Sequence, residues 1–308
     1  MMVAVLAAIF PIVAILLLGK AVGKMGLVSD EGWLGLESIT YYVLFPALII
    51  SKLAIADFEG LDWRMPVVLI VAQVFMAVAS IWLGKFLGQS GERIGVYVQS
   101  GVRWNTFIAI ALAQDLIGED GIILVAVAAA AMVPTSNLLS TIALGRYSSG
   151  QTSTSSLMRQ VMINPLIIAS IIGLAINVLE ISLIPSVLNF MDILADGAVA
   201  TGLLASGAYV QLRNASTSVA VLMGWSMFRL LGLPLIAGVI AFALDVSPEI
   251  FLVVLIATAV PTASNGAILA RKLGGDATLA ANLIAVQTIL ALLSFTGILW
   301  VAEAFGLT

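Results

Sequence analysis

The sequence predicts an all-α integral membrane protein with ten transmembrane helices. Hydrophobic residues make up 61% of its 308 positions and charged residues only 10%, with a mean hydropathy of +1.15. A soluble domain carries roughly 25% charged residues and could not cover its surface with so few. Apolar runs of about 20 residues, the length that crosses a bilayer as a helix, recur along the chain and favour helices over a β-barrel.

Ten apolar segments follow one another with short connections. One extended polar segment, Gly145–Gln160, is rich in Ser and Thr and is predicted to be a linker. It separates a first five-helix repeat, residues 1–144, from a second, residues 161–308. The predicted helices 1 to 10 are Val3–Val22, Trp33–Ala54, Met65–Leu87, Glu92–Ile117, Gly121–Leu144, Val161–Leu179, Ser186–Val210, Ser216–Ala243, Pro248–Leu273 and Ala277–Phe305.

The basic residues predict how these helices are oriented. Lys20 and Lys24 follow the first helix, whereas a cleaved signal peptide has its basic residues in front, so this helix is expected to be retained. With ten helices both termini lie on the same side of the membrane. That side has two basic residues, Lys52 and Arg64, whereas the opposite side has nine. The positive-inside rule therefore predicts a multi-pass protein of the inner (cell) membrane, with both termini outside and the linker cytoplasmic.

Five helices in each half predict inverted repeats, because an odd number reverses the orientation of the second half. Phe10–Gly19 (FPIVAILLLG) matches Asn164–Gly173 (NPLIIASIIG) at an offset of 154. Ala111–Glu119 (ALAQDLIGE) matches Ile268–Asp276 (ILARKLGGD) at an offset of 157. Two matches at nearly the same offset support the repeat.

Predicted helices 4 and 9 are interrupted at their midpoints. The interruptions are Arg103–Thr106 (RWNT) and Val260–Asn265 (VPTASN), and the repeat register pairs Trp104 with Pro261. Pro261 removes a backbone donor and clashes with the preceding turn, so we expect broken helices that cross each other. A proline kink capped by Ser and Thr is the alternative for each helix alone. Paired broken helices in a repeated membrane protein favour a transporter's substrate site.

Polar residues at the two breaks are the candidate substrate-binding residues. Half-helix N-termini carry partial positive charge and free N–H groups, which predicts an anion. Arg103 lies at membrane depth, where it is expected either to bind a carboxylate or to cap carbonyls of the first half-helix. Asn137, beside Pro134 in helix 5, is expected to face the crossing or to bind loosened backbone. The candidate set is Arg103, Asn105, Thr106, Asn137, Pro261, Thr262, Ser264 and Asn265.

A second group of charges lies within helices 7 and 8. Asp192 and Asp196 are four residues apart and share one face of helix 7, and Arg229 lies in the middle of helix 8. These residues predict either a structural ion pair or a site for a coupling proton or cation, and the sequence leaves both alternatives open.

The absence of Cys and His from the sequence excludes several classes of chemistry. It excludes disulfides, thiol nucleophiles, imidazole bases and the usual zinc sites. We therefore expect no enzyme, no metal, no cofactor and no nucleic-acid partner. The expected partners are the lipid bilayer and a small organic anion.

Several segments resemble the auxin efflux carrier family in its bacterial branch, which includes proposed malonate and malate carriers. They are spread over nearly the whole chain: YYVLFPALI, RWNTFIAIALA, VPTSNLLS, NPLIIA and VPTASNGAILARKLGGDATLAA. The resemblance implies a scaffold of helices 1, 2, 6 and 7 and a moving transport unit of helices 3–5 and 8–10. It also implies an elevator-type mechanism and a homodimer built on the scaffold helices. Where plant members have Pro before the Asn of helix 4, this chain has Trp104.

The residues and the resemblance together predict a secondary transporter that moves small organic anions by alternating access. Mono- or dicarboxylates are the expected substrates, and auxin-like acids belong to the same class. Two alternatives are a passive anion channel and a sodium-coupled carrier of the bile-acid-transporter type. A sodium site needs clustered carboxylates and carbonyls, and neither Asp nor Glu stands beside the two breaks.

Overall fold

The computed structural model describes residues 2–56, 62–148, 165–209, 217–304 and 306, and these residues form helices and short connections without a strand. This confirms the all-α prediction. Five helical segments are each long and apolar enough to cross a membrane, and a bent pair, Ala277–Ala291 with Leu293–Ala304, would be a sixth. The five are Asp30–Ile55, Arg64–Phe86, Glu119–Tyr147, Pro185–Ala208 and Val219–Ala243.

Each of the ten predicted segments contains a helix, although the number of membrane crossings and the repeat stay predictions. Most of the predicted linker, Gly145–Gln160, lies outside the described residues. The helices are α1 (Met2–Lys24), α2 (Asp30–Ile39), η1 (Thr40–Leu44), α3 (Phe45–Ile55), α4 (Arg64–Phe86), α5 (Gly91–Val102), α6 (Thr106–Leu116), α7 (Glu119–Tyr147), α9 (Pro165–Val178), α10 (Pro185–Ala208), α11 (Val219–Ala243), α12 (Pro248–Ala259), α13 (Gly266–Lys272) and α14 (Ala277–Ala304).

Prolines inside the apolar segments have different local outcomes. At Pro46 the chain widens into the π-helical turn η1, in which the N–H of Phe45 bonds to the carbonyl of Thr40, and the helix then continues as α3. At Pro134, α7 stays continuous, and the Thr135 hydroxyl donates to the carbonyl of Ala131 at 2.8 Å. The breaks therefore lie in the predicted helices 4 and 9 and not in helix 5.

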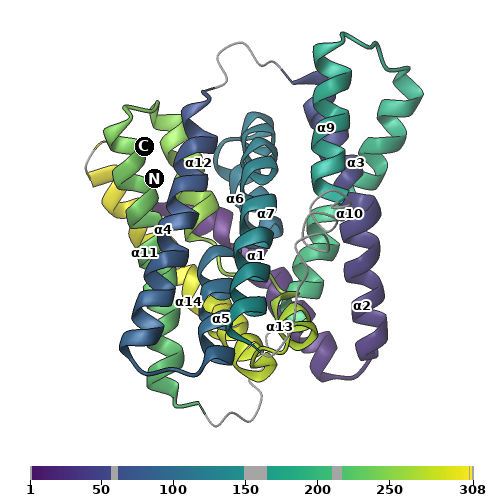
Figure 1. Ribbon diagram of the computed structural model, residues 1–308. Coiled ribbons are helices and arrows are strands. Elements are labelled where there is room, and N and C mark those ends of the chain that lie inside the picture. Colours follow the sequence, from purple (N-terminus) through teal and green to yellow (C-terminus); the bar gives the residue numbers. More distant parts are fainter. Residues whose placement is uncertain (1, 57–61, 149–164, 210–216, 305, 307–308) are drawn as a thin grey trace.

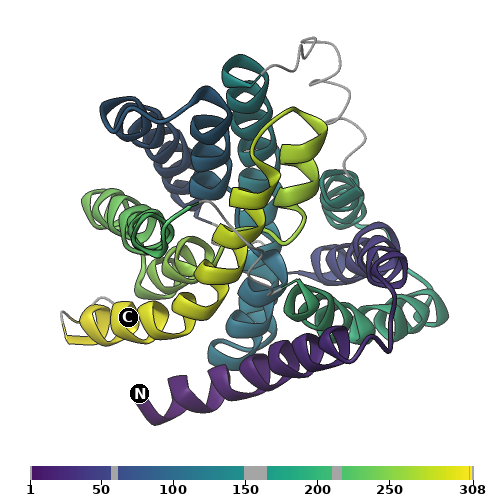
Figure 2. The same ribbon diagram turned by 90° about the horizontal axis from the view of Figure 1, so that it is seen from below.

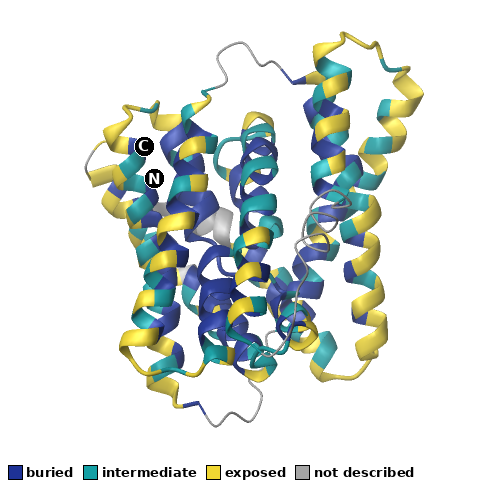
Figure 3. Cartoon of the chain, in the orientation of Figure 1, coloured by how far each residue is buried: buried dark blue, intermediate teal, exposed yellow. Residues whose placement is uncertain are grey.

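The helices form two groups (Figures 1 and 2). In the first group, α1 packs on α10, and α3 packs on both α9 and α10. The α1–α10 contact is very close, since a Cβ built on Gly19 would lie 2.1 Å from the carbonyl oxygen of Leu204. In the second group, α4, α5 and α7 pack together, and α11 packs on α4, α12 and α14. The half-helices α5 and α12 are almost wholly buried, whereas α2 and α10 expose much of their surface (Figure 3).

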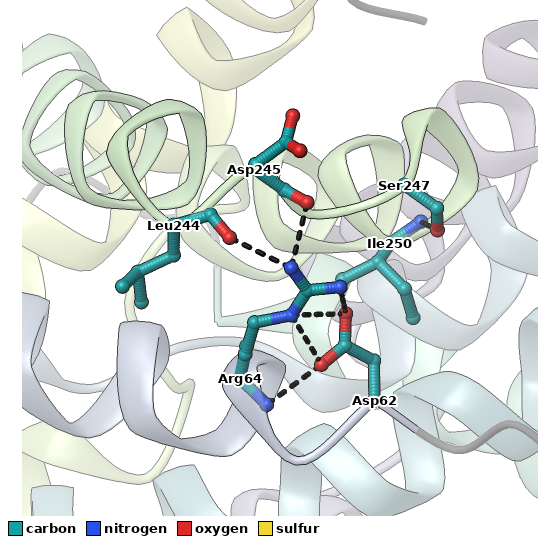
Figure 4. A network of polar contacts seen from close by, with 6 residues as sticks. All are labelled: Asp62, Arg64, Leu244, Asp245, Ser247 and Ile250. Atoms are coloured by element: carbon teal, nitrogen blue, oxygen red, sulfur yellow. Dashed lines mark hydrogen bonds and ion pairs between the residues drawn. The ribbon is translucent and has the colours of Figure 1, made fainter.

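A polar network ties the start of α4 to the connection between α11 and α12 (Figure 4). Arg64 donates from its backbone N–H and its Nε to Asp62, at 2.9 Å and 2.8 Å. Its Nη1 donates to the carbonyls of Leu244 and Asp245, both at 2.8 Å. The hydrogen bond from Arg64 lowers the pKa of the Asp62 carboxyl below its ordinary value of 3.8. The network therefore holds α4 against the end of α11.

Candidate functional site

The first break joins α5 to α6, and its residues Arg103 and Asn105 have extended backbone conformations. The side-chain oxygen of Asn105 accepts hydrogen bonds from the N–H groups of Phe107 (3.1 Å) and Ile108 (3.2 Å). Asn105 is thus the N-cap of α6, a position for which Asn is strongly preferred. Its amide nitrogen donates to Ser206 of α10 at 3.2 Å, which ties this break to the first helix group.

The second break joins α12 to α13 and begins with the extended residue Val260. The N–H of Thr262 donates to the side-chain oxygen of Gln287 of α14 at 3.0 Å. The N–H of Asn105 in the first break donates to the carbonyl of Pro261 at 2.8 Å. Both interruptions therefore lie where the sequence predicts them, and they are in direct contact.

Side chains of α4 and α11 bind the carbonyl groups at the ends of α5 and α12. These carbonyls have no partner within their own helices. Gln73 of α4 donates to the carbonyl of Val102 at 2.9 Å. Arg229 of α11, with 1% of its surface exposed, makes the corresponding contacts at the second break. Its guanidinium donates to the carbonyls of Thr258, Val260 (3.0 Å) and Arg103 (3.3 Å).

A cavity of about 60 Å³ lies where the two breaks meet. In it, the guanidinium of Arg103 donates to the side-chain oxygen of Asn265 at 2.7 Å and so links the first break to the second. The Ser264 hydroxyl donates to the carboxyl group of Glu37 at 3.0 Å and links the second break to α2. The polar lining residues are Glu37, Tyr41, Arg103, Asn105, Thr106, Ser136, Asn137, Ser264 and Asn265.

A larger cavity of about 440 Å³ adjoins this one and extends past Thr141 and Lys272. Small-molecule sites usually occupy about 300–1,000 Å³, so the joined space suits a small ligand. The two cavities share Glu37, Tyr41, Arg103, Asn137 and Asn265. A third cavity of about 870 Å³, between α11, α12 and α14, has an almost wholly apolar lining and includes no residue of either break.

The family described as membrane transport protein matches residues 4–299, which include both breaks and the cavity where they meet. The chain belongs to this membrane transport protein family. It is the auxin efflux carrier family that the sequence motifs indicated. An uncharacterized transporter of Methanothermobacter thermautotrophicus is 25% identical over 295 residues, covering 93% of this chain and 94% of that protein. Family membership supports a multi-pass membrane transporter rather than an enzyme.

Most of the predicted binding residues of this membrane transport protein meet in one place. The cavity lining includes Arg103, Asn105, Thr106, Asn137, Ser264 and Asn265. Pro261 and Thr262 lie elsewhere. Pro261 lines a separate small cavity of about 20 Å³, and Thr262 is buried beside Gln287. Both therefore shape the break without facing the cavity.

The three charges predicted in helices 7 and 8 do not come together. Asp192 and Asp196 line a cavity of about 160 Å³, into which Lys52 also projects beside its ion-pair partner Glu119 (2.5 Å). Arg229 binds backbone carbonyls, and no ion pair joins it to either aspartate, all three being described residues. The cause is packing: α10 lies against α1 and α3, whereas α11 lies against α4, α12 and α14.

Several polar residues that contact the breaks are not among those that the sequence pointed to, including Glu37, Gln73 and Ser206. Each interrupts an otherwise apolar predicted helix, and Glu37 is the stronger signal because an acid at membrane depth is rare and usually functional. Among the described residues, no three His, Cys, Asp or Glu side chains are grouped to hold a metal ion.

Proposed function

We propose that the chain is a secondary carrier for small organic anions, with mono- or dicarboxylates as its substrates. The observation that carries this proposal is the position of Arg103. Its guanidinium lies in the cavity at the meeting point of two broken helices, and one of its nitrogens binds the neutral side chain of Asn265. Arginine presents several N–H donors in a planar fork that matches a carboxylate, which leaves donors for a substrate.

The arrangement of the helices supports alternating access of the elevator type. In the proposed topology, ten spans form two inverted repeats, α1, α2–α3, α9 and α10 are the scaffold, and α4–α7 with α11–α14 are the transport unit. The cavity lies between these two groups, because Glu37 and Leu166 line it from the scaffold while Arg103 and Ser264 line it from the transport unit. A site at such a boundary can open to either side when one group slides along the other.

The proposed orientation makes this state open to the cytoplasm. The larger cavity extends to Lys272, on the side that the positive-inside rule places in the cytoplasm together with the linker. On the opposite side the Lys52–Glu119 ion pair joins α3 of the scaffold to α7 of the transport unit. Exposed apolar side chains of α9 and α10, such as Ile171, Phe190 and Ile193, are the proposed homodimer or lipid surface.

Binding and counterflow measurements test the proposal. Purified protein is screened by thermal shift against acetate, malonate, malate, succinate and indole-3-acetate, and each acid is then tested in proteoliposomes for counterflow. At least one carboxylate should stabilise the protein and show counterflow, which separates a carrier from a channel. Arg103→Ala should lower its affinity about 10- to 100-fold, because a hydrogen bond to a charged group contributes about 1.5–3 kcal/mol.

The matched control is Arg271→Ala, which removes an exposed arginine of α13 that lies outside both cavities. Unchanged carboxylate binding in Arg103→Ala, or binding lost equally in both variants, would contradict the role of Arg103. Uptake that requires sodium would favour the sodium-coupled alternative.

A further inference from the structure

Helix α2 places a carboxyl group inside the proposed anion site. Glu37 lines both joined cavities, and only 8% of its surface is exposed. It accepts a hydrogen bond from the Ser264 hydroxyl at 3.0 Å. A carboxylate is costly to bury without an ion-pair partner, and a buried acid that lacks one can become neutral by taking up a proton.

The groups that face Glu37 come from four other elements. The charge of Arg103, at the end of α5, acts on Glu37, but its guanidinium is bound to Asn265 and the two residues form no ion pair. Tyr41 of η1 lines the same cavity, the phenol of Tyr209 at the end of α10 lies beside the carboxyl group, and Lys272 of α13 lies in the adjoining cavity. Asp30 and Glu31 are exposed acids at the start of α2.

These neighbours favour different states of Glu37 in the empty and the occupied site. In the empty site burial opposes ionisation of the Glu37 carboxyl group, whereas the Ser264 hydroxyl and the charge of Arg103 stabilise its ionised form. A substrate carboxylate bound to Arg103 offsets the positive charge of that residue and adds a second negative charge near the buried carboxyl group of Glu37. Two carboxylates that share one site cannot both stay ionised without a large cost.

We propose that Glu37 binds one proton when a carboxylate occupies the site, so that substrate binding on the open side is proton-linked. The inference rests on the proposed function, since it takes the ligand to be an organic anion held by Arg103. The charges balance, because one proton from the medium converts the Glu37 carboxylate to the neutral acid for each carboxylate bound. The affinity for the anion then falls as the pH rises, by up to tenfold per pH unit.

The test measures the affinity of purified protein for acetate, malonate and malate at pH 6, 7 and 8, together with proton uptake on binding in weakly buffered detergent solution. Wild-type protein should bind the anion more weakly as the pH rises and should take up close to one proton per anion. Glu37→Gln keeps an oxygen that accepts from Ser264, and it should show an affinity independent of pH and no proton uptake. Glu37→Asp should retain both effects, and Glu31→Gln is the matched control on the same helix.

The outcomes separate this inference from the carrier proposal. If no carboxylate binds wild-type protein at any pH, the carrier proposal fails. If carboxylates bind without proton uptake, or with the same proton uptake in Glu37→Gln as in wild type, the role of Glu37 is overturned and the carrier stands. A thermal melt of each empty variant shows whether it is folded. If Glu37→Gln does not fold, the number of protons taken up per anion by wild type and by Glu37→Asp tests the inference. A number near zero in both proteins overturns it.

Discussion

The two breaks each separate two half-helices, but they take their positive charge from different places. At the first break the cation, Arg103, belongs to the break itself and points into the cavity, while the neutral Gln73 binds the helix end. At the second break the residue in the corresponding position is the neutral Val260, and the helix end is bound by the cation Arg229. Each break thus has one arginine, but only that of the first break faces the cavity.

The difference separates a structural arginine from a functional one. Gln73 and Arg229 lie 156 positions apart, between the two offsets of the sequence matches, and they occupy equivalent helices of the proposed repeat. Arg229 is buried, donates to backbone carbonyls and lines neither of the joined cavities, so it is not placed to bind a ligand there. Arg103 is half-buried and donates to a side chain at the cavity. Stability and anion binding should therefore depend on different arginines.

The largest expected effect follows from removing the structural arginine. Arg229→Met keeps much of the volume but leaves the carbonyls at the end of α12 without donors. Each buried acceptor left unpaired costs about 1–3 kcal/mol, so we expect a loss of about 3 kcal/mol or more in the free energy of unfolding. SDS titration of the purified protein, followed by tryptophan fluorescence, measures it. A loss below about 1 kcal/mol would show that water or relaxed backbone replaces the guanidinium.

The corresponding change at the first break should cost less. Gln73→Leu removes the donor to Val102 without removing a charge, so we expect a loss of about 1–3 kcal/mol by the same titration. Equal losses in Gln73→Leu and Arg229→Met would mean that the cation adds nothing beyond its hydrogen bonds, and the comparison between the breaks would lose its basis.

A pair of asparagines extends the comparison from stability to binding. Asn105 caps α6, and replacing such a cap by Ala costs about 0.5–2 kcal/mol, so Asn105→Ala should lower the thermal midpoint. Asn265 caps no helix with its side chain and instead holds Arg103. Asn265→Ala should leave the midpoint nearly unchanged and should weaken carboxylate binding about 3- to 10-fold. The reverse pattern would mean that the second break stabilises the fold and that the first break binds the ligand.

The sequence predicted where the chain breaks but not what the breaks touch. The breaks are local features, because Pro261 and a cluster of polar residues interrupt apolar runs whatever packs around them. The contacts of Gln73, Glu37 and Gln287 depend on which faces of α4, α2 and α14 turn toward the breaks, and no local pattern encodes that. The same limit explains why the sequence left an ion pair between Asp192 and Arg229 open as one of two alternatives, although their helices pack on different neighbours.

The smallest expected effect concerns the contact between α4 and α11, the helices whose side chains bind the carbonyls at the ends of α5 and α12. Arg64 joins the start of α4, which carries Gln73, to the end of α11, which carries Arg229 (Figure 4). Because Arg64 lowers the folded-state pKa of Asp62 below 3.8, this contact stabilises the fold fully above that pH and ceases to do so as the pH falls through the lowered value. Asp62→Asn should therefore lower the thermal midpoint slightly at pH 7 and by progressively less as the pH falls below 3.8.

The exposed acid Glu303 provides the control for this pH series. Glu303→Gln should shift the midpoint by the same small amount, or not at all, throughout the range, because no described ion pair involves that residue. If Asp62→Asn behaves like Glu303→Gln, the Asp62–Arg64 contact does not hold α4 against α11. The buried contacts between these helices would then be enough to keep Gln73 and Arg229 at their helix ends, and the difference between the two breaks would rest on packing alone.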